Sequence, residues 1–446
     1  MIYQHENRIP FLEKMSYWSA LLAAFSFAFP SKYMNIGYVL WMIIWSVEII
    51  FRKQHTLEKL SKKNIHIYLL LGLVLWTAIS LFWTENFSEV EIVFQRKASL
   101  LIFPFLVLFG FNKHFKFKAF LSFYILGAVL SVIVLLSTAI YFYLTIGHEF
   151  PDILQFYEAK IAPYKHRTFF CFTQILSLLF FYFLKDDFSK EIGKKLYWLT
   201  FIVLNLSALL YIFSAGGRMV LIIYFSVQIS LIAYELWRKG HKKKMIVFSV
   251  LLVSLFVFGL MYHPRMPEVE NFNSKSISNV DPRVTMWTSS ANAIADNFWL
   301  GVGVGDRKDV FKEYYAQIEV PNKYKPDTTT SSHNSFIDNQ LELGVIGTLL
   351  LLGIIAFSIT NTNKKNRNII LLLSVSWAMV AAIESIGTIE SIYLFMLFLI
   401  LVRCFKEDNF IHEQLESKLI QKNVFVVLSF VSLLLAITAT IGRFVL

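Results

Sequence analysis

The chain has 446 residues, of which 56% are hydrophobic, 17% aromatic and only 16% charged, and its formal net charge is +11. This composition excludes an ordinary soluble globular protein, in which about a quarter of the residues are charged. The positive charge does not indicate nucleic-acid binding, because Lys and Arg cluster in short segments between apolar runs. The sequence therefore predicts an all-α fold, a polytopic bundle of membrane helices.

Apolar runs of membrane-spanning length occupy most of the chain. A span needs roughly 20 predominantly apolar residues, with a range of about 17–25. We expect 12 or 13 spans, of which one is short and one is tilted or partly re-entrant (98–111 and 390–404, respectively). A polar stretch before the first run predicts a short cytoplasmic tail and not a cleaved signal peptide. The expected spans are 11–29, 36–51, 66–83, 98–111, 119–146, 168–184, 196–213, 219–236, 245–262, 341–360, 368–385, 390–404 and 423–442.

The distribution of Lys and Arg predicts the orientation of these spans. With the N-terminus in the cytoplasm and alternating spans, 26 of the 42 Lys and Arg residues lie in cytoplasmic segments. Half of the others fall in the long loop 263–340, and long loops contribute little to orientation. This loop is therefore expected to face the periplasm or cell exterior. We divide the single integral domain into an N-terminal bundle, 1–262, the long loop, 263–340, and C-terminal membrane helices, 341–446.

The long loop is the polar part of an apolar chain, and its pattern predicts local order. Asp281, Pro282 and Arg283 are expected to begin a helix, because Pro is favoured in a first helical turn. A glycine-rich tight turn is expected at 299–305, because glycine permits sharp turns and close backbone approach. Asp306 is expected to cap a second helix that runs to about Gln317.

Two arginines and a histidine are the candidate catalytic residues on the outer face. Arg218 lies at the outer end of a span, where it either snorkels to the interface or binds phosphate through its planar guanidinium. Arg283 belongs to the first predicted loop helix. His333 follows a hydroxyl-rich stretch; a lone loop histidine is often only solvated, but imidazole also suits general-base work near neutral pH.

Other polar residues at outer span ends are candidate substrate contacts. Contact with lipid headgroups is the better explanation of the cationic pairs, and the two glutamates either pair with cations or orient a sugar hydroxyl. Cys171 and Cys404 lie in or beside apolar runs, so neither a disulfide nor a metal site is expected. No nucleotide-binding or metal-binding motif occurs, so we expect no cofactor and no metal. The candidate contacts are Arg96, Lys97, His166, Arg167, Asn334, Glu384 and Glu390.

The order of these motifs resembles the O-antigen ligase and polysaccharide polymerase superfamily. The resemblance spans roughly residues 66–405, and each motif alone is short. It runs through Trp83 to Asn86, Arg96-Lys97, Ser214 to Arg218, Arg283 to Trp287, Asn297 to Gly303, His333 to Ser335 and Glu342 to Gly347.

The resemblance implies a fold like that of the lipid-carrier-dependent GT-C-type glycosyltransferases. It also implies a metal-independent, inverting glycosyltransferase of lipopolysaccharide or surface-polysaccharide biosynthesis in the bacterial inner membrane. Its donor would be a glycan on undecaprenyl diphosphate, and its acceptor a hydroxyl of lipid A core, a growing glycan or another molecule. The family's two arginines and loop histidine would correspond to Arg218, Arg283 and His333.

Three alternatives stay open on the sequence alone. A polymerase would use the same donor to extend the glycan on its carrier. A transporter of lipid-linked sugars is a second alternative, and it would also bind membrane lipids. Transporters often contain internal repeats, and this sequence lacks them. A non-catalytic scaffold would use the long loop to bind a partner.

Overall fold

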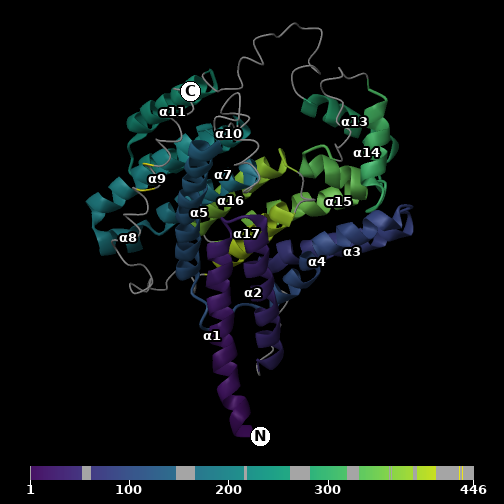
Figure 1. Cartoon of the computed structure of the whole chain (residues 1–446), viewed down its shortest axis with the longest axis horizontal. Coiled ribbons are helices and arrows are strands. Elements are labelled where there is room, and N and C mark those ends of the chain that lie inside the picture. The colour runs from purple at the N-terminus through teal and green to yellow at the C-terminus, as the bar shows by residue number, and fades with distance from the viewer. Residues whose placement is uncertain are drawn as a thin grey trace. The chain divides into compact units, whose positions relative to one another are not determined.

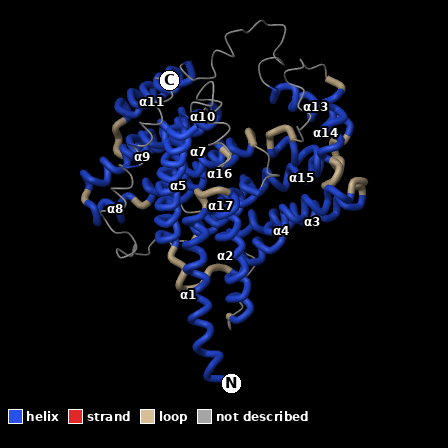
Figure 2. The backbone as a smooth tube through the Cα atoms, in the orientation of Figure 1, coloured by secondary structure: helices blue, strands red, loops and turns tan. Residues whose placement is uncertain are grey.

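The computed structural model is helical throughout the part of the chain that it describes, with no strand there (Figure 2). It describes residues 2–52, 62–146, 166–214, 218–261, 282–318, 331–360, 364–384 and 389–407, together with 362, 431 and 434.

These residues form two compact units, each assembled from separate parts of the chain. The first unit comprises residues 1–55, 111–263 and 407–446, and the second 56–110 and 264–406. The described residues of the long polar segment, 282–318 and 331–340, therefore belong to one unit with helices from earlier and later in the chain, which the sequence did not predict.

The first unit contains eight of the described helices. Aromatic stacking joins α2 to the segment before α5, since the Trp45 and Phe111 rings lie 5.0 Å apart and the Phe111 and Phe115 rings 4.1 Å apart. Gly127 lets α5 approach α1 closely, because a Cβ there would lie 2.0 Å from the Phe25 carbonyl oxygen. The helices are α1 (Ile2–Ser26), α2 (Ser31–Phe51), α5 (Phe117–Ile146), α7 (Arg167–Phe183), α8 (Lys185–Ile192), α9 (Lys194–Ser214), α10 (Arg218–Arg238) and α11 (Lys242–Met261).

The second unit contains two groups of helices that meet at α15 (Ser335–Ile359). Apolar helices form one group, and the other consists of the two helices of the long polar segment, which lie near α15 in Figure 1. Met286, Ala293, Phe311 and Leu341 share one buried core, so this segment is folded against α15. The other elements are η1 (Lys62–Asn64), α3 (Ile65–Ile79), η2 (Ser80–Phe82), α4 (Phe87–Phe109), α13 (Pro282–Asp296), α14 (Arg307–Ala316), α16 (Lys364–Ala381) and α17 (Ile389–Lys406).

Every expected span except the last corresponds to a helix, and the span 423–442 falls almost wholly outside the described residues. By length and hydropathy, six described helices are able to cross a membrane, or seven if the pair α7 and α8, bent by 70°, is one span. The run 98–111 is not a short span, because its helix starts at Phe87. Asn86 caps α4 by accepting a hydrogen bond from the Glu89 backbone, and this cap lets two polar turns precede the apolar run.

A kink at Gly344 divides α15 and is held by the glycine-rich turn. Gly344 has φ of 65°, a left-handed conformation that costs little only for glycine. The kink releases backbone carbonyls from their helical partners. Val302 N donates to the Leu341 carbonyl at 2.9 Å, and Gly303 N to the Glu342 carbonyl at 3.1 Å. The turn predicted at 299–305 is thus a tight turn whose backbone completes the hydrogen bonding of α15.

Candidate active site

The loop before α15 holds His333 in a fixed backbone conformation. His333 has φ of +52°, in the left-handed region. The residue before it is fully buried: Ser332 donates to Asp338 Oδ1 from its backbone N at 2.9 Å and from its Oγ at 2.7 Å. On the other side, Asn334 caps α15 by accepting from the backbones of Phe336 and Ile337. Buried hydrogen bonds on both sides thus fix the histidine backbone.

A carboxylate faces the His333 side chain. His333 Nδ1 lies 3.8 Å from Glu384 Oε2, and the histidine side chain is 45% exposed while that of Glu384 is 7% exposed. The Ser335 hydroxyl donates to the Glu384 backbone carbonyl, which holds the end of α16 beside the start of α15. This separation is longer than a hydrogen bond, so the carboxylate acts on the imidazole through its charge, and the other ring nitrogen stays available for proton transfer.

Helix α13 connects Arg283 to the His333 loop. Trp287 Nε1 donates to the Ser332 backbone carbonyl at 3.0 Å. Arg283 lies four residues before Trp287 on α13, and such residues are neighbours on one helix face. Arg283 is half-buried and the Trp287 side chain is partly exposed. The structure therefore brings two of the three predicted catalytic residues into one unit, with a tryptophan between them.

Four charged side chains lie beside this loop. Lys97 on α4 forms an ion pair with Glu342, whose other oxygen lies 3.4 Å from Arg307 Nε. Arg307 Nη1 also lies 3.5 Å from Asp338 Oδ1, the atom that binds Ser332. Two cations and two carboxylates thus link α4 and α14 to the start of α15. Because the pairs are largely buried, the loss of one partner is expected to cost more than it would at an exposed pair.

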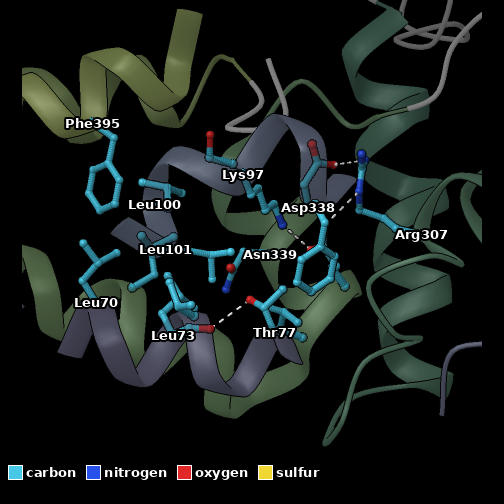
Figure 3. Close-up of a pocket in the computed structure, with 16 residues that line it drawn as sticks. Leu70, Leu73, Thr77, Lys97, Leu100, Leu101, Arg307, Asp338, Asn339 and Phe395 are labelled. Atoms are coloured by element: carbon cyan, nitrogen blue, oxygen red, sulfur yellow. Dashed lines mark hydrogen bonds and ion pairs between the residues drawn. The ribbon is translucent and has the colours of Figure 1, made fainter. Parts of the chain in front are cut away.

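The same four side chains form one end of a pocket (Figure 3). The pocket has about 830 Å³ of empty space, a volume that includes open solvent at its mouth. Charged and amide side chains come from α4, α14 and α15, and α3 adds the hydroxyl of Thr77. The apolar lining comes mainly from α3 and α4. The apolar residues include Leu70, Leu73, Val74, Leu100, Leu101 and Phe395.

The segment that joins η2 to α4 packs on the start of α14. Asp306 accepts hydrogen bonds from the backbones of Glu85, at 2.8 Å, and Asn86, at 2.7 Å. The predicted helix after Asp306 is present, but the predicted capping role of its side chain is wrong: the Asp306 carboxylate makes no bond to α14. The carboxylate instead binds the backbone N–H groups of Glu85 and Asn86. These donors are 221 and 220 residues away in the chain, so the sequence around Asp306 does not reveal them.

The remaining predicted contacts differ in where the structure places them. Lys97 faces Glu342, whereas its neighbour Arg96 is exposed on another face of α4. His166 is exposed in the first unit, and Arg218 and Arg167 begin helices of that unit, so the roles expected of these three residues stay predictions. The side chains of Arg167, Arg218 and Glu390 lie outside what the structure describes.

Sequence reasoning missed Arg307, Asp338 and Glu342 as site residues. A signal was present in the carboxylates, because Asp338 and Glu342 are four residues apart and so share one face of α15. Their cationic partners come from helices distant in sequence, which no local pattern predicts. Among the described residues, no group of three His, Cys, Asp or Glu side chains is arranged to hold a metal ion.

Residues 171–352 match the model of a family described as O-antigen ligase. The match supports placing the chain in the O-antigen ligase-like superfamily. It includes Arg218, Arg283 and His333, but it ends before Glu384 and begins after Lys97. No curated protein gives a significant sequence match to the chain.

Proposed function

We propose that this O-antigen ligase-like membrane protein transfers a glycan from undecaprenyl diphosphate to an acceptor hydroxyl at the periplasmic face of the bacterial inner membrane. The family match supports the broader role, an O-antigen ligase-like or polymerase-like function in polysaccharide biosynthesis. The observation that carries the finer proposal is that His333 faces Glu384, while Trp287 of the Arg283 helix binds the residue before His333.

In the proposed reaction, the acceptor hydroxyl attacks the anomeric carbon of the donor glycan. A new carbon–oxygen bond forms as the bond from that carbon to the diphosphate oxygen breaks, and undecaprenyl diphosphate leaves with the electron pair. The acceptor proton passes to the imidazole of His333. Attack on the face opposite the leaving group inverts the anomeric centre. Glu384 acts as a positioning residue, because a carboxylate beside the imidazolium stabilises the charge that it gains.

The two arginines are proposed to bind the diphosphate. Guanidinium groups form paired hydrogen bonds to phosphate oxygens and stabilise the charge that develops on the leaving group. Arg283 is supported by its position one helical turn from Trp287. Arg218 is supported by the sequence resemblance and by its place at the first residue of α10. Because the diphosphate is already a good leaving group, this route uses neither a metal nor a nucleotide.

The test is removal of the gene from its host, followed by analysis of surface glycans and of lipid-linked intermediates extracted in parallel. A ligase predicts full-length polymer on the lipid carrier and no glycan on the final acceptor, such as lipid A core. A polymerase predicts single repeat units on both. If neither pool changes, glycan transfer is wrong, and a transporter or a scaffold explains the protein better. Plasmid expression of the wild type, with an Arg367→Lys variant as a matched control, should restore the glycan.

A further inference from the structure

We propose that the pocket between α3, α4 and α15 binds a lipid whose head is uncharged and bears hydroxyl groups, and that it does not bind the phosphate of a lipid carrier. This inference deepens the proposed function, because the pocket shares Asp338 with the His333 loop. It rests on three features of the pocket: its charges, its unpaired polar atoms and its apolar wall.

The charges of the pocket are already paired. Lys97 and Arg307 supply two positive charges, and Asp338 and Glu342 supply two negative charges within 3.5 Å of them. A phosphate placed here would meet two carboxylates and no excess of positive charge, so its desolvation would not be offset. A neutral head avoids this cost.

Two buried polar atoms of the pocket residues have no hydrogen-bond partner. Asp338 is only 5% exposed, and its Oδ2 has none, although Oδ1 accepts from Ser332. The amide Nδ2 of the adjacent Asn339 also has none. A buried acceptor or donor without a partner is costly, because it has given up its hydrogen bonds to water. A hydroxyl group both donates and accepts, so a ligand with several hydroxyl groups has the chemistry that both atoms lack.

The opposite wall of the pocket is apolar. Leu70 and Leu73 on α3 and Leu100 and Leu101 on α4 line it, with Phe395 on α17 (Figure 3). This wall is suited to a hydrocarbon chain that continues from the polar head. Small-molecule sites are mostly apolar with a few placed polar groups. Here the unpaired carboxylate oxygen of Asp338 and the unpaired amide of Asn339, next to an apolar wall, favour an amphiphile with hydroxyl groups at its head.

The test uses the purified full-length protein in polymer-bounded native membrane discs. An n-octyl β-glucoside with a diazirine at its chain end is photoactivated, and the labelled peptides are identified by mass spectrometry. Label is expected in α3 and α4. Excess n-octyl β-glucoside should reduce labelling by about tenfold, and n-octyl phosphate should not, because a tenfold preference needs only about 1.4 kcal/mol, within the range for one buried hydrogen bond. Equal competition by n-octyl phosphate would overturn the proposal.

Matched variants locate the bound probe. Leu73→Trp fills the pocket and should abolish labelling, whereas Leu75→Trp, on the same helix but 63% exposed and outside the lining, should keep it. If Leu73→Trp fails to fold, Asn339→Leu removes the amide donor and should weaken glucoside competition severalfold. The proposal would be overturned if folded Leu73→Trp is still labelled, or if the glucoside competes as well in Asn339→Leu as in the wild type. Labelling needs no glycan donor, so a protein that binds the glucoside but transfers no glycan contradicts only the proposed function.

Discussion

Asp338 holds the residue that precedes His333 through two hydrogen bonds, both from Ser332, at 2.9 and 2.7 Å. The first prediction concerns this pair. Asp338→Ala leaves the buried Ser332 N and Oγ without their acceptor, which costs about 1–3 kcal/mol for each buried group. We expect lower thermal stability and a loss of transfer that exceeds the loss of folded protein. Asp338→Asn keeps one carbonyl oxygen for Ser332 and should recover part of the activity. Full activity in folded Asp338→Ala would show that the Ser332 bonds do not position His333.

The second prediction concerns the two arginines. Arg283→Lys keeps the positive charge but loses the planar fork, so partial loss of transfer is expected, with a smaller effect than that of Arg283→Ala. The same order is expected for Arg218→Lys and Arg218→Ala. Rates are measured in membranes at matched expression. An alanine variant at either position with wild-type transfer would exclude that arginine from phosphate binding.

The third prediction compares two tryptophans near the kink of α15. Trp76 Nε1 donates to the Leu343 carbonyl at 2.8 Å, whereas the buried Nε1 of Trp83 has no hydrogen-bond partner. Trp76→Phe should therefore lower stability by about 0.5–1.5 kcal/mol more than Trp83→Phe, beyond the shared loss of ring area. Thermal unfolding in one detergent measures the difference. Equal decreases in unfolding temperature for the two variants would mean that the hydrogen bond from Trp76 does not stabilise the kink.

The fourth prediction separates strain from steric overlap at two glycines. Gly344 and Gly193 both have positive φ, 65° and 81°. A Cβ at Gly344 would lie 2.2 Å from the Trp299 carbonyl oxygen, whereas a Cβ at Gly193 meets nothing within 4 Å. Gly193→Ala should cost about 1–2 kcal/mol, and Gly344→Ala should prevent the turn from docking and unfold the surrounding unit. Limited proteolysis and thermal unfolding compare them, and similar stability of the two variants would contradict this account.

The sequence predicted the helices well because their signals are local. Runs of apolar residues define the spans, and Pro282 and Asp306 mark helix starts in the long segment. The error at the span 98–111 arose because polar residues such as Lys97 lie within a longer helix, where a charged partner across the unit accommodates them.

The site was less predictable because its contacts join residues far apart in the chain. His333 and Arg283 were predicted from their residue types, but the Trp287–Ser332 bond between their elements depends on tertiary packing. Glu384 was expected to pair with a cation or a sugar, and its contact with His333 depends on how α16 ends beside α15. The joint role of Arg218 with these residues stays a prediction.

The most direct test of glycan transfer uses the purified protein in liposomes, with a short glycan on undecaprenyl diphosphate and a fluorescent hydroxyl acceptor. Product and released undecaprenyl diphosphate should appear in equal amounts. We predict that His333→Ala lowers the rate by about 10²–10⁴-fold, that Glu384→Gln lowers it less, and that the control His241→Ala leaves it unchanged. Product formation by His333→Ala at the wild-type rate, or glycan transfer without release of undecaprenyl diphosphate, would contradict the account.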